Sequence, residues 1–207
     1  MDSLFISKYC HIKNNKIVVD GKTVYTDDES TDLAAFAKKA YRHLKPSYNK
    51  FFKMDEISKL GFLAAEVLLS DIDVAEYQPE DIAIIISNSH STLTTDINHQ
   101  HTIKDADSFF PSPKIFVYTL PNIMIGEISI RHKLRGENTF FIVENFNAEL
   151  LVNHINSLFL THKSNAFVGG WVNQNKNDYE AFLFLASNEK GVQFNALEMN
   201  KLYRLID

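Results

Sequence analysis

The residues that could do chemistry most directly stand at a junction between an expected strand and an expected helix. The run "IVENFNAELL" at 142–151 has the pattern of a strand end, a tight polar turn and the start of an amphipathic helix. Enzymes often hold a nucleophile in such a turn, at the positive end of the new helix. Here the turn offers Glu144 and Asn145, and an amide nitrogen is no nucleophile. Glu144 could act as a general base if it is buried, or it could cap the helix.

A second group of candidate residues lies in the polar stretch 87–114. His90, Asp96, His99 and His101 could be drawn as a metal cluster, but this run has no firm ligand spacing and no cysteine. Ser89 beside His90 could suggest a hydrolase, but the chain has no Gly-x-Ser-x-Gly elbow. We therefore predict no metal site and no cofactor, and we interpret 87–114 as a surface excursion.

Composition limits the possible functions. With 207 residues, 45% hydrophobic residues and no break in composition, the chain is expected to form a single domain over 1–207. A net charge of −5 without a basic stripe argues against nucleic-acid binding. No run is long and apolar enough to span a membrane, and "MDSLFISKYC" has an acid, Asp2, where a signal peptide would carry lysines, so a cytoplasmic location is expected. The single cysteine, Cys10, excludes an internal disulfide and lies in a strand-like segment.

Hydrophobic periodicity predicts alternating helices and strands. Amphipathic helices are expected at 32–44, 54–71 and 147–162, the second opened by Asp55 as N-cap. Strands are expected within 81–86, 139–143, 165–172 and 181–187, which are nearly continuous apolar runs. This order predicts an α/β fold with a mixed β-sheet of about five strands and helices on both faces. The 147–162 helix also carries a polar stripe with Glu149, which is expected to face solvent.

The segment 111–145, "PSPKIFVYTLPNIMIGEISIRHKLRGENTFFIVEN", resembles the stretch that leads to the active site of β-ketoacyl synthases, within the thiolase-like superfamily. The family's motif positions fall in order on Ser112, Pro113, Phe116, Asn122, Gly126 and Gly136. Downstream, Gly169 and Gly170 stand where the family has paired glycines. The resemblance covers nearly the whole chain and implies half of a thiolase-like fold, the N-terminal ketoacyl-synthase-like domain without the C-terminal half.

The resemblance places the family's nucleophilic cysteine at Asn145, with Glu144 just before it. An asparagine cannot form the acyl thioester, and the histidines of the family's second half have no counterpart here. The chain is therefore similar to the chain-length factors that pair with an active ketosynthase in polyketide, aryl polyene or fatty acid synthesis. The expected strand "TFFIV" at 139–143 would then be a candidate dimer edge, with a partner ketosynthase or in a homodimer.

The basic run "RHKLR" has two interpretations. Arg131, Lys133 and Arg135 precede Gly136, as cations do in the last turn of a helix that ends at a glycine. Alternatively, as the resemblance implies, these cations dock an acidic acyl carrier protein.

A different class of function also remains open. The chain could be a stand-alone acyl-thioester hydrolase or decarboxylase that uses Glu144 or a histidine of the 87–101 region. A buried pocket lined by Glu144, Asn145 and a histidine would favour this alternative.

Overall fold

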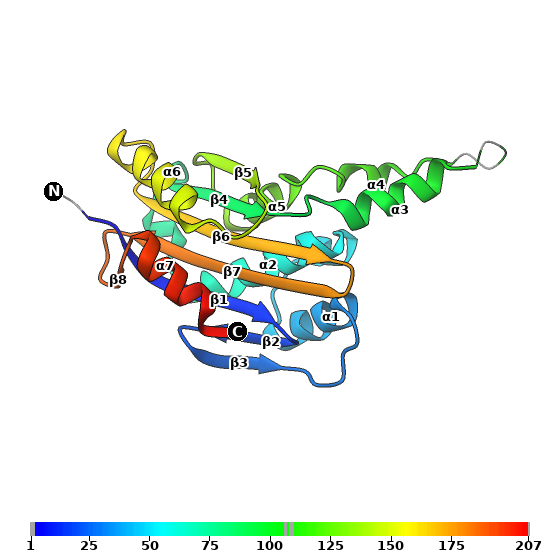
Figure 1. Cartoon of the computed structure of the whole chain (residues 1–207), viewed down its shortest axis with the longest axis horizontal. Coiled ribbons are helices and arrows are strands. Elements are labelled where there is room, and N and C mark those ends of the chain that lie inside the picture. Colours follow the sequence, from blue (N-terminus) through cyan, green and yellow to red (C-terminus); the bar gives the residue numbers. More distant parts are fainter. Residues whose placement is uncertain (1–2, 106, 108–109, 207) are drawn as a thin grey trace.

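An eight-stranded mixed sheet forms the middle layer of the computed structural model, which describes residues 3–105, 107 and 110–206. The strand order is β3-β2-β1-β7-β6-β4-β5, and β8 pairs with β1. The strands are β1 (Phe5–Lys13), β2 (Lys16–Val19), β3 (Lys22–Thr26), β4 (Ile82–Asn88), β5 (Asn138–Ile142), β6 (Ala166–Asn175), β7 (Asp178–Ser187) and β8 (Val192–Gln193). Strand β4 pairs in parallel with β5 and β6, and β7 runs antiparallel to β6 and β1 (Figure 1).

The mixed α/β fold predicted from periodicity is confirmed, but the sheet is larger than the expected five or so strands. The additional strands are β2, β3 and β8. Strand β3 is almost entirely exposed, and β8 has two residues, neither of them buried. These strands therefore lack the continuous apolar run that marks a strand covered on both faces.

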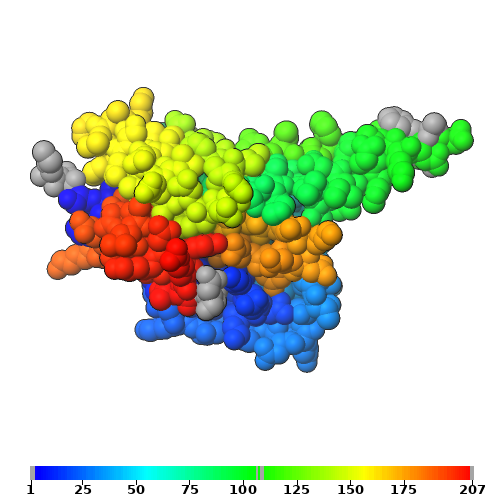
Figure 2. Space-filling model, viewed as in Figure 1, coloured from blue at the N-terminus to red at the C-terminus, as the bar shows by residue number. Residues whose placement is uncertain are grey.

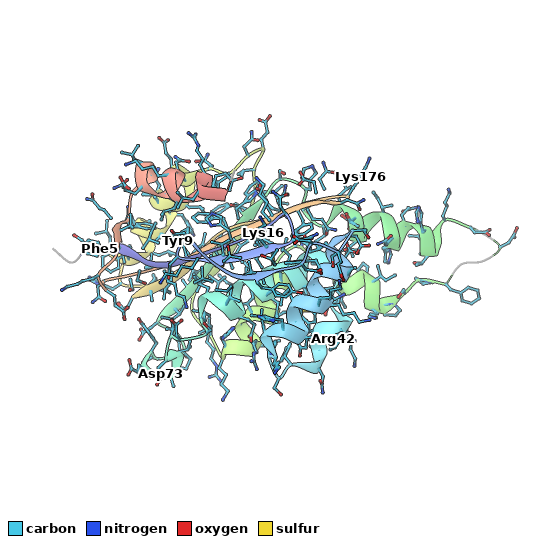
Figure 3. All side chains as sticks on the ribbon, turned by 90° about the horizontal axis from the view of Figure 1, so that it is seen from below. Phe5, Tyr9, Lys16, Arg42, Asp73 and Lys176 are labelled. Carbon is cyan, nitrogen blue, oxygen red and sulfur yellow. The ribbon has the colours of Figure 1, made fainter. Side chains whose placement is uncertain are left out.

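Helices cover both faces of the sheet. They are α1 (Leu33–Leu44), α2 (Glu56–Leu68), α3 (Leu93–Ile103), α4 (Pro113–Val117), α5 (Ile123–His132), α6 (Ala148–Leu160) and α7 (Ala196–Tyr203), with short 3-10 turns at Asn49–Lys53, Val74–Glu76 and Arg204–Ile206. Figure 3 shows α1 and α2 on one side of the strands and α7 on the other. Asp55 caps α2 as predicted, because its carboxylate accepts a hydrogen bond from the Ser58 backbone N–H at 3.0 Å.

Two hydrophobic clusters bind these layers to the sheet. In β4, Ile84 and Ile86 pack with α1, α2 and α5, whereas Ala83 and Ile85 pack with α6 and α7. All seven residues of β4 are buried. Helix α6 contributes Leu151 to the second cluster and keeps Glu149 exposed, so the expected polar stripe faces solvent.

The stretch 87–114, expected to be a surface excursion, contains helix α3 and the start of α4, which were not predicted. These two helices form an arm that projects well beyond the sheet (Figures 1 and 2). Thr95 is the buried residue of α3, so this helix has little of the apolar periodicity by which a helix is recognised in sequence. None of the helices within the described ranges is long and apolar enough to cross a membrane.

A buried carboxylate connects three segments on the α1–α2–α5 side. Glu127 of α5 is 3% exposed and accepts hydrogen bonds from Tyr118 Oη at 3.0 Å and Tyr48 Oη at 3.3 Å. The Lys50 Nζ atom lies 2.8 Å from the same carboxylate. Burial, and then the bond to Glu127, raise the pKa of the Tyr118 hydroxyl. A buried carboxylate with one ammonium and two hydroxyl partners fixes the position of α5 against two segments that precede it in the chain.

Replacing Glu127 should therefore destabilise the fold. We expect Glu127→Ala to lower the free energy of unfolding by about 2–3 kcal/mol, because two tyrosine hydroxyls and an ammonium lose their partner. The measurement is urea-induced unfolding followed by circular dichroism. The matched control is Glu137→Ala at an exposed position, which should stay within about 0.5 kcal/mol of the wild type. Equal effects of the two substitutions would contradict the structural role of Glu127.

Candidate functional site

The junction between β5 and α6 has the strand, turn and helix predicted for 142–151. The strand ends at Ile142, and the Val143 backbone N–H still donates to the Asn88 carbonyl of β4 at 2.8 Å. Helix α6 begins at Ala148, and the Asn147 side chain accepts a hydrogen bond from the Leu150 N–H at 2.9 Å. Capping by Glu144 is therefore wrong, because Asn147 occupies the N-cap position with an oxygen that reaches the first turn.

Glu144 and Asn145 are both exposed at this junction. Burial is what would raise the pKa of a carboxylate toward that of a general base. The condition under which Glu144 was expected to act as a base is therefore not met. The turn presents both side chains to solvent, and neither of them lies in a buried pocket.

Aromatic contacts from distant segments hold the junction in place. Phe146 stacks on Tyr203 at the end of α7, with ring centroids 4.1 Å apart, and meets Phe182 of β7 edge-on at 5.6 Å. Glu180 of β7 accepts hydrogen bonds from Tyr203 Oη and from Trp171 Nε1, both at 2.8 Å. Trp171, predicted to be a core residue, is 2% exposed. Sequence analysis missed Phe146, Glu180 and Tyr203, because nothing in their local patterns shows that they meet.

A second polar group lies at the same edge of the sheet, at the carboxyl ends of the parallel strands β4 and β6. Ser89 Oγ lies 2.7 Å from His90 Nδ1, and Asn173 Oδ1 lies 3.2 Å from both atoms. The buried Asn88 side chain holds the turn that carries them through two hydrogen bonds with Ser91. Ser89 and His90 were noticed in the sequence, whereas Asn173 comes from a strand more than 80 positions later.

The histidines considered as metal ligands do not converge. His90 contacts Ser89, whereas His99 packs on the Phe116 ring at 5.4 Å between centroids. His101 lines a pocket beside lysines. Across the described ranges, no three His, Cys, Asp or Glu side chains are arranged to hold a metal ion.

The cations of the basic run differ in their contacts: Arg131 is partly buried and paired, and the other two are exposed. Arg131 binds the Glu66 carboxylate of α2 through Nε at 2.6 Å and Nη2 at 3.1 Å, whereas Lys133 and Arg135 are exposed. Burial would raise the pKa of Glu66, but hydrogen bonds from His132 and Arg131 outweigh it and lower the pKa. Helix α5 ends with Lys133 in the left-handed conformation (φ 59°), so the expected glycine cap at Gly136 is wrong. Gly136 instead allows close contact with the Ile82 carbonyl.

The other family motif positions mainly shape the backbone. Ser112 caps α4, its Oγ accepting from the Ile115 N–H at 3.4 Å, with Pro113 in the first turn. Asn122 holds the N-cap position of α5 without a side-chain cap bond. Gly170 has a φ of 150°, and a Cβ there would lie 2.0 Å from the Phe182 carbonyl oxygen of β7. A Cβ at Gly169 would meet the Phe184 ring at 2.5 Å, so the paired glycines let β7 and its aromatic rings lie close to β6.

Comparison with solved structures identifies the fold. The chain is similar to the ishigamide ketosynthase/chain length factor, with a TM-score of 0.64, 15% identity, and coverage of 89% of this chain and 62% of the other. It is also similar to a chain of AntDE:AntF, a type II polyketide synthase carrier protein in complex with its ketosynthase. The TM-score is 0.61 and the identity 14%, with coverage of 90% of this chain and 63% of the other. A third match is the ketosynthase ApeO in complex with its chain length factor ApeC from Xenorhabdus doucetiae. The TM-score is 0.57 and the identity 13%, with coverage of 91% of this chain and 80% of the other.

These similarities show a shared fold. Over about nine tenths of its length the chain shares the fold of these ketosynthase and chain-length-factor structures. It spans a little over three fifths of the length of the first two matched chains. No protein-family model matches the sequence, and no curated protein sequence matches it significantly.

The motif glycines permit a matched stability test. We expect Gly170→Ala to lower the free energy of unfolding by more than about 2 kcal/mol, because the new Cβ collides with the Phe182 carbonyl and the backbone conformation is strained. Gly126→Ala should raise it by about 0.5–1 kcal/mol, because its Cβ would meet nothing within 4 Å and alanine favours a helix. Thermal and urea unfolding measure both values. A neutral Gly170→Ala would contradict the close contact of β6 and β7.

Proposed function

We propose that this chain is a cytoplasmic, non-catalytic ketosynthase-like subunit that acts beside an active ketosynthase, as chain-length factors do, in polyketide, aryl polyene or fatty acid synthesis. The observation that carries the proposal is the open edge of β5, directly before an exposed turn with Asn145 at the expected cysteine position. The solved complexes of a ketosynthase with its chain length factor and with its carrier protein support the choice of partners.

The free edge of β5 has the geometry for strand pairing. Among the described residues, β5 pairs with β4 alone. The Val143 N–H and the Glu137 carbonyl bond to β4, and successive residues of a strand point their backbone groups to opposite sides. The N–H and C=O groups of Phe140 and Ile142 therefore point away from β4. Ile142 also exposes 57% of its surface, so this edge can accept a strand of another chain.

The projecting arm supports a larger interface. Large hydrophobic side chains of α3, α4 and the turn that follows are about half exposed: Leu93, Ile97, Phe116, Val117 and Leu120. Exposed apolar residues that gather on one part of a surface often mark a protein interface. The arm leaves the body near the end of β4, next to β5 (Figure 1). A partner paired with β5 would lie within reach of this apolar surface.

The chemistry of the junction supports a non-catalytic role. Asn145 has no nucleophilic atom, and Glu144 is exposed. The exposed cations Lys133 and Arg135 are the ones available to an acidic carrier protein. Arg131 serves a structural role instead, because its guanidinium is held by Glu66.

Strand pairing can be tested with one position on β5. The chain is mixed with a candidate ketosynthase, and complex formation is measured by size-exclusion chromatography with light scattering. Ile142→Pro removes an outward N–H and leaves the β4 ladder intact, so we expect the affinity to fall about tenfold or more. The control Ile142→Thr keeps the N–H and should change the affinity less than about threefold.

The acyl products give the functional test. Mass analysis of the carrier protein should show a changed acyl chain length when this chain is present, and Asn145→Ala should preserve the change. A homodimer that excludes the ketosynthase, or products that do not depend on this chain, would overturn the proposal. Ile142→Pro binding as tightly as the wild type would show that β5 is not the paired edge.

A second candidate function is acyl-thioester hydrolysis, and the contact of Ser89 with His90 favours it. In this reaction Ser89 Oγ attacks the thioester carbonyl while His90 Nδ1 takes its proton. The carbon–sulfur bond then breaks, the leaving thiolate takes that proton, and water hydrolyses the acyl-serine. Glu144 has no part in this scheme, because it is exposed.

Thiol release from acyl-thioesters by the purified chain tests this second function. Turnover that both Ser89→Ala and His90→Gln reduce about a hundredfold or more, and that His99→Gln preserves, would establish it. No turnover, or turnover unchanged in Ser89→Ala, would exclude it.

A further inference from the structure

A pocket lined by lysines lies between the N-terminal end of α2 and the arm. Its volume is about 440 Å³, and it is lined by Lys53, Lys59 and Lys114 together with the apolar side chains of Met54 and Ile115. Pockets that bind small molecules in proteins have volumes of about 300–1,000 Å³. We call this cavity the lysine pocket. None of its lining residues belongs to the β5–α6 junction.

The three lysines have no ion-pair partner within the part of the chain that the structure describes. This separates them from Lys8, Lys39 and Lys50, each of which is paired with a carboxylate. Lys59 and Lys114 lie close enough that the charge of Lys114 disfavours the charged form of Lys59, and Lys59 is partly buried whereas Lys53 and Lys114 are exposed. With Asp55 and Glu56 also in its lining, the pocket has three lysines and two carboxylates, an excess of one formal positive charge.

The two carboxylates that also line the pocket are bound by neutral donors. Asp55 accepts hydrogen bonds from the Ser58 N–H at 3.0 Å and from Thr95 Oγ1 at 2.7 Å. Glu56 accepts from Gln174 Nε2 at 2.5 Å. These contacts hold the carboxylates to α2, α3 and β6, so neither forms an ion pair with a lysine.

The surroundings of Lys59 disfavour its charged form. Its side chain is partly buried on α2. Burial lowers the pKa of its ammonium, and Lys114 lowers it further, although Glu56 and Asp55 act in the opposite direction. A bound anion would offset both effects, because it favours the charged form of a neighbouring lysine.

We propose that the lysine pocket binds a small organic phosphate. A phosphate group brings three acceptor oxygens, one for each lysine of the lining, whereas a carboxylate brings two. Met54 and Ile115 provide an apolar wall for the organic part of such a ligand. The inference is independent of the function proposed above, because it uses neither the β5 edge nor Asn145.

Titration calorimetry with phenyl phosphate in low-salt buffer tests the site, with inorganic phosphate and benzoate as comparison probes. We expect saturable one-to-one binding of phenyl phosphate that weakens as salt is added. Lys59→Gln and Lys114→Gln should each weaken it about tenfold. Lys163→Gln, at an exposed position after α6, is the matched control and should bind like the wild type.

The unfolding transitions of the variants provide an independent check. Lys114→Gln removes a charge that repels Lys59, so it should unfold no earlier than the wild type, and its weaker binding cannot then be attributed to a lost fold. No saturable binding, or equal binding by both pocket variants and the wild type, would overturn the proposal. Benzoate binding as tightly as phenyl phosphate would overturn the assignment to phosphates.

Discussion

The burial of β4 on both faces is the constraint on which the rest of the structure depends. Every residue of this strand is buried, with Ile84 facing α1, α2 and α5 and Ile85 facing α6 and α7. A strand that is apolar on both sides requires a helical layer on each side. Its parallel neighbours β5 and β6 then end at the same edge as β4. The turn with Asn145 and the Ser89–His90 pair share that edge for this reason.

Close approach of the backbone determines how the second face is covered. The paired glycines at 169 and 170 bring β7 and the Phe184 ring close to β6. Helix α7 then packs beside α6, and its last residue, Tyr203, stacks on Phe146. The junction after β5 is therefore firmly anchored at Phe146, although Glu144 and Asn145 are exposed. An anchored, exposed turn beside an open strand edge suits contact with a second protein better than the enclosure of a substrate.

Some charged side chains of this chain are paired with other residues of the fold, and others have no ion-pair partner among the described residues. Glu127 and Glu66 are largely buried and are satisfied by cations and hydroxyls, and both position α5. Arg131 belongs to this group, and its guanidinium also lies 5.8 Å from the Tyr48 ring centre. Lys53, Lys59 and Lys114 belong to the other group, because they line a cavity and form no ion pair with any residue that the structure describes. Unpaired charge around a cavity is costly to the free protein and favours an anionic ligand, whereas paired charge favours a defined fold.

The sequence by itself determined the fold class, the extents of the strongly periodic elements and the turn after β5. These features depend on local apolar patterns and on caps such as Asp55, which act within a few residues. The tertiary structure alone decided which polar residues meet: Asn173 with His90, Tyr203 with Phe146 and Glu180, and Gln174 with Glu56. It also decided that Arg131 is bound by Glu66, that Glu144 is exposed and that 87–114 contains a helix. The reason is that burial and pairing depend on segments distant in the sequence, whose approach no local pattern records.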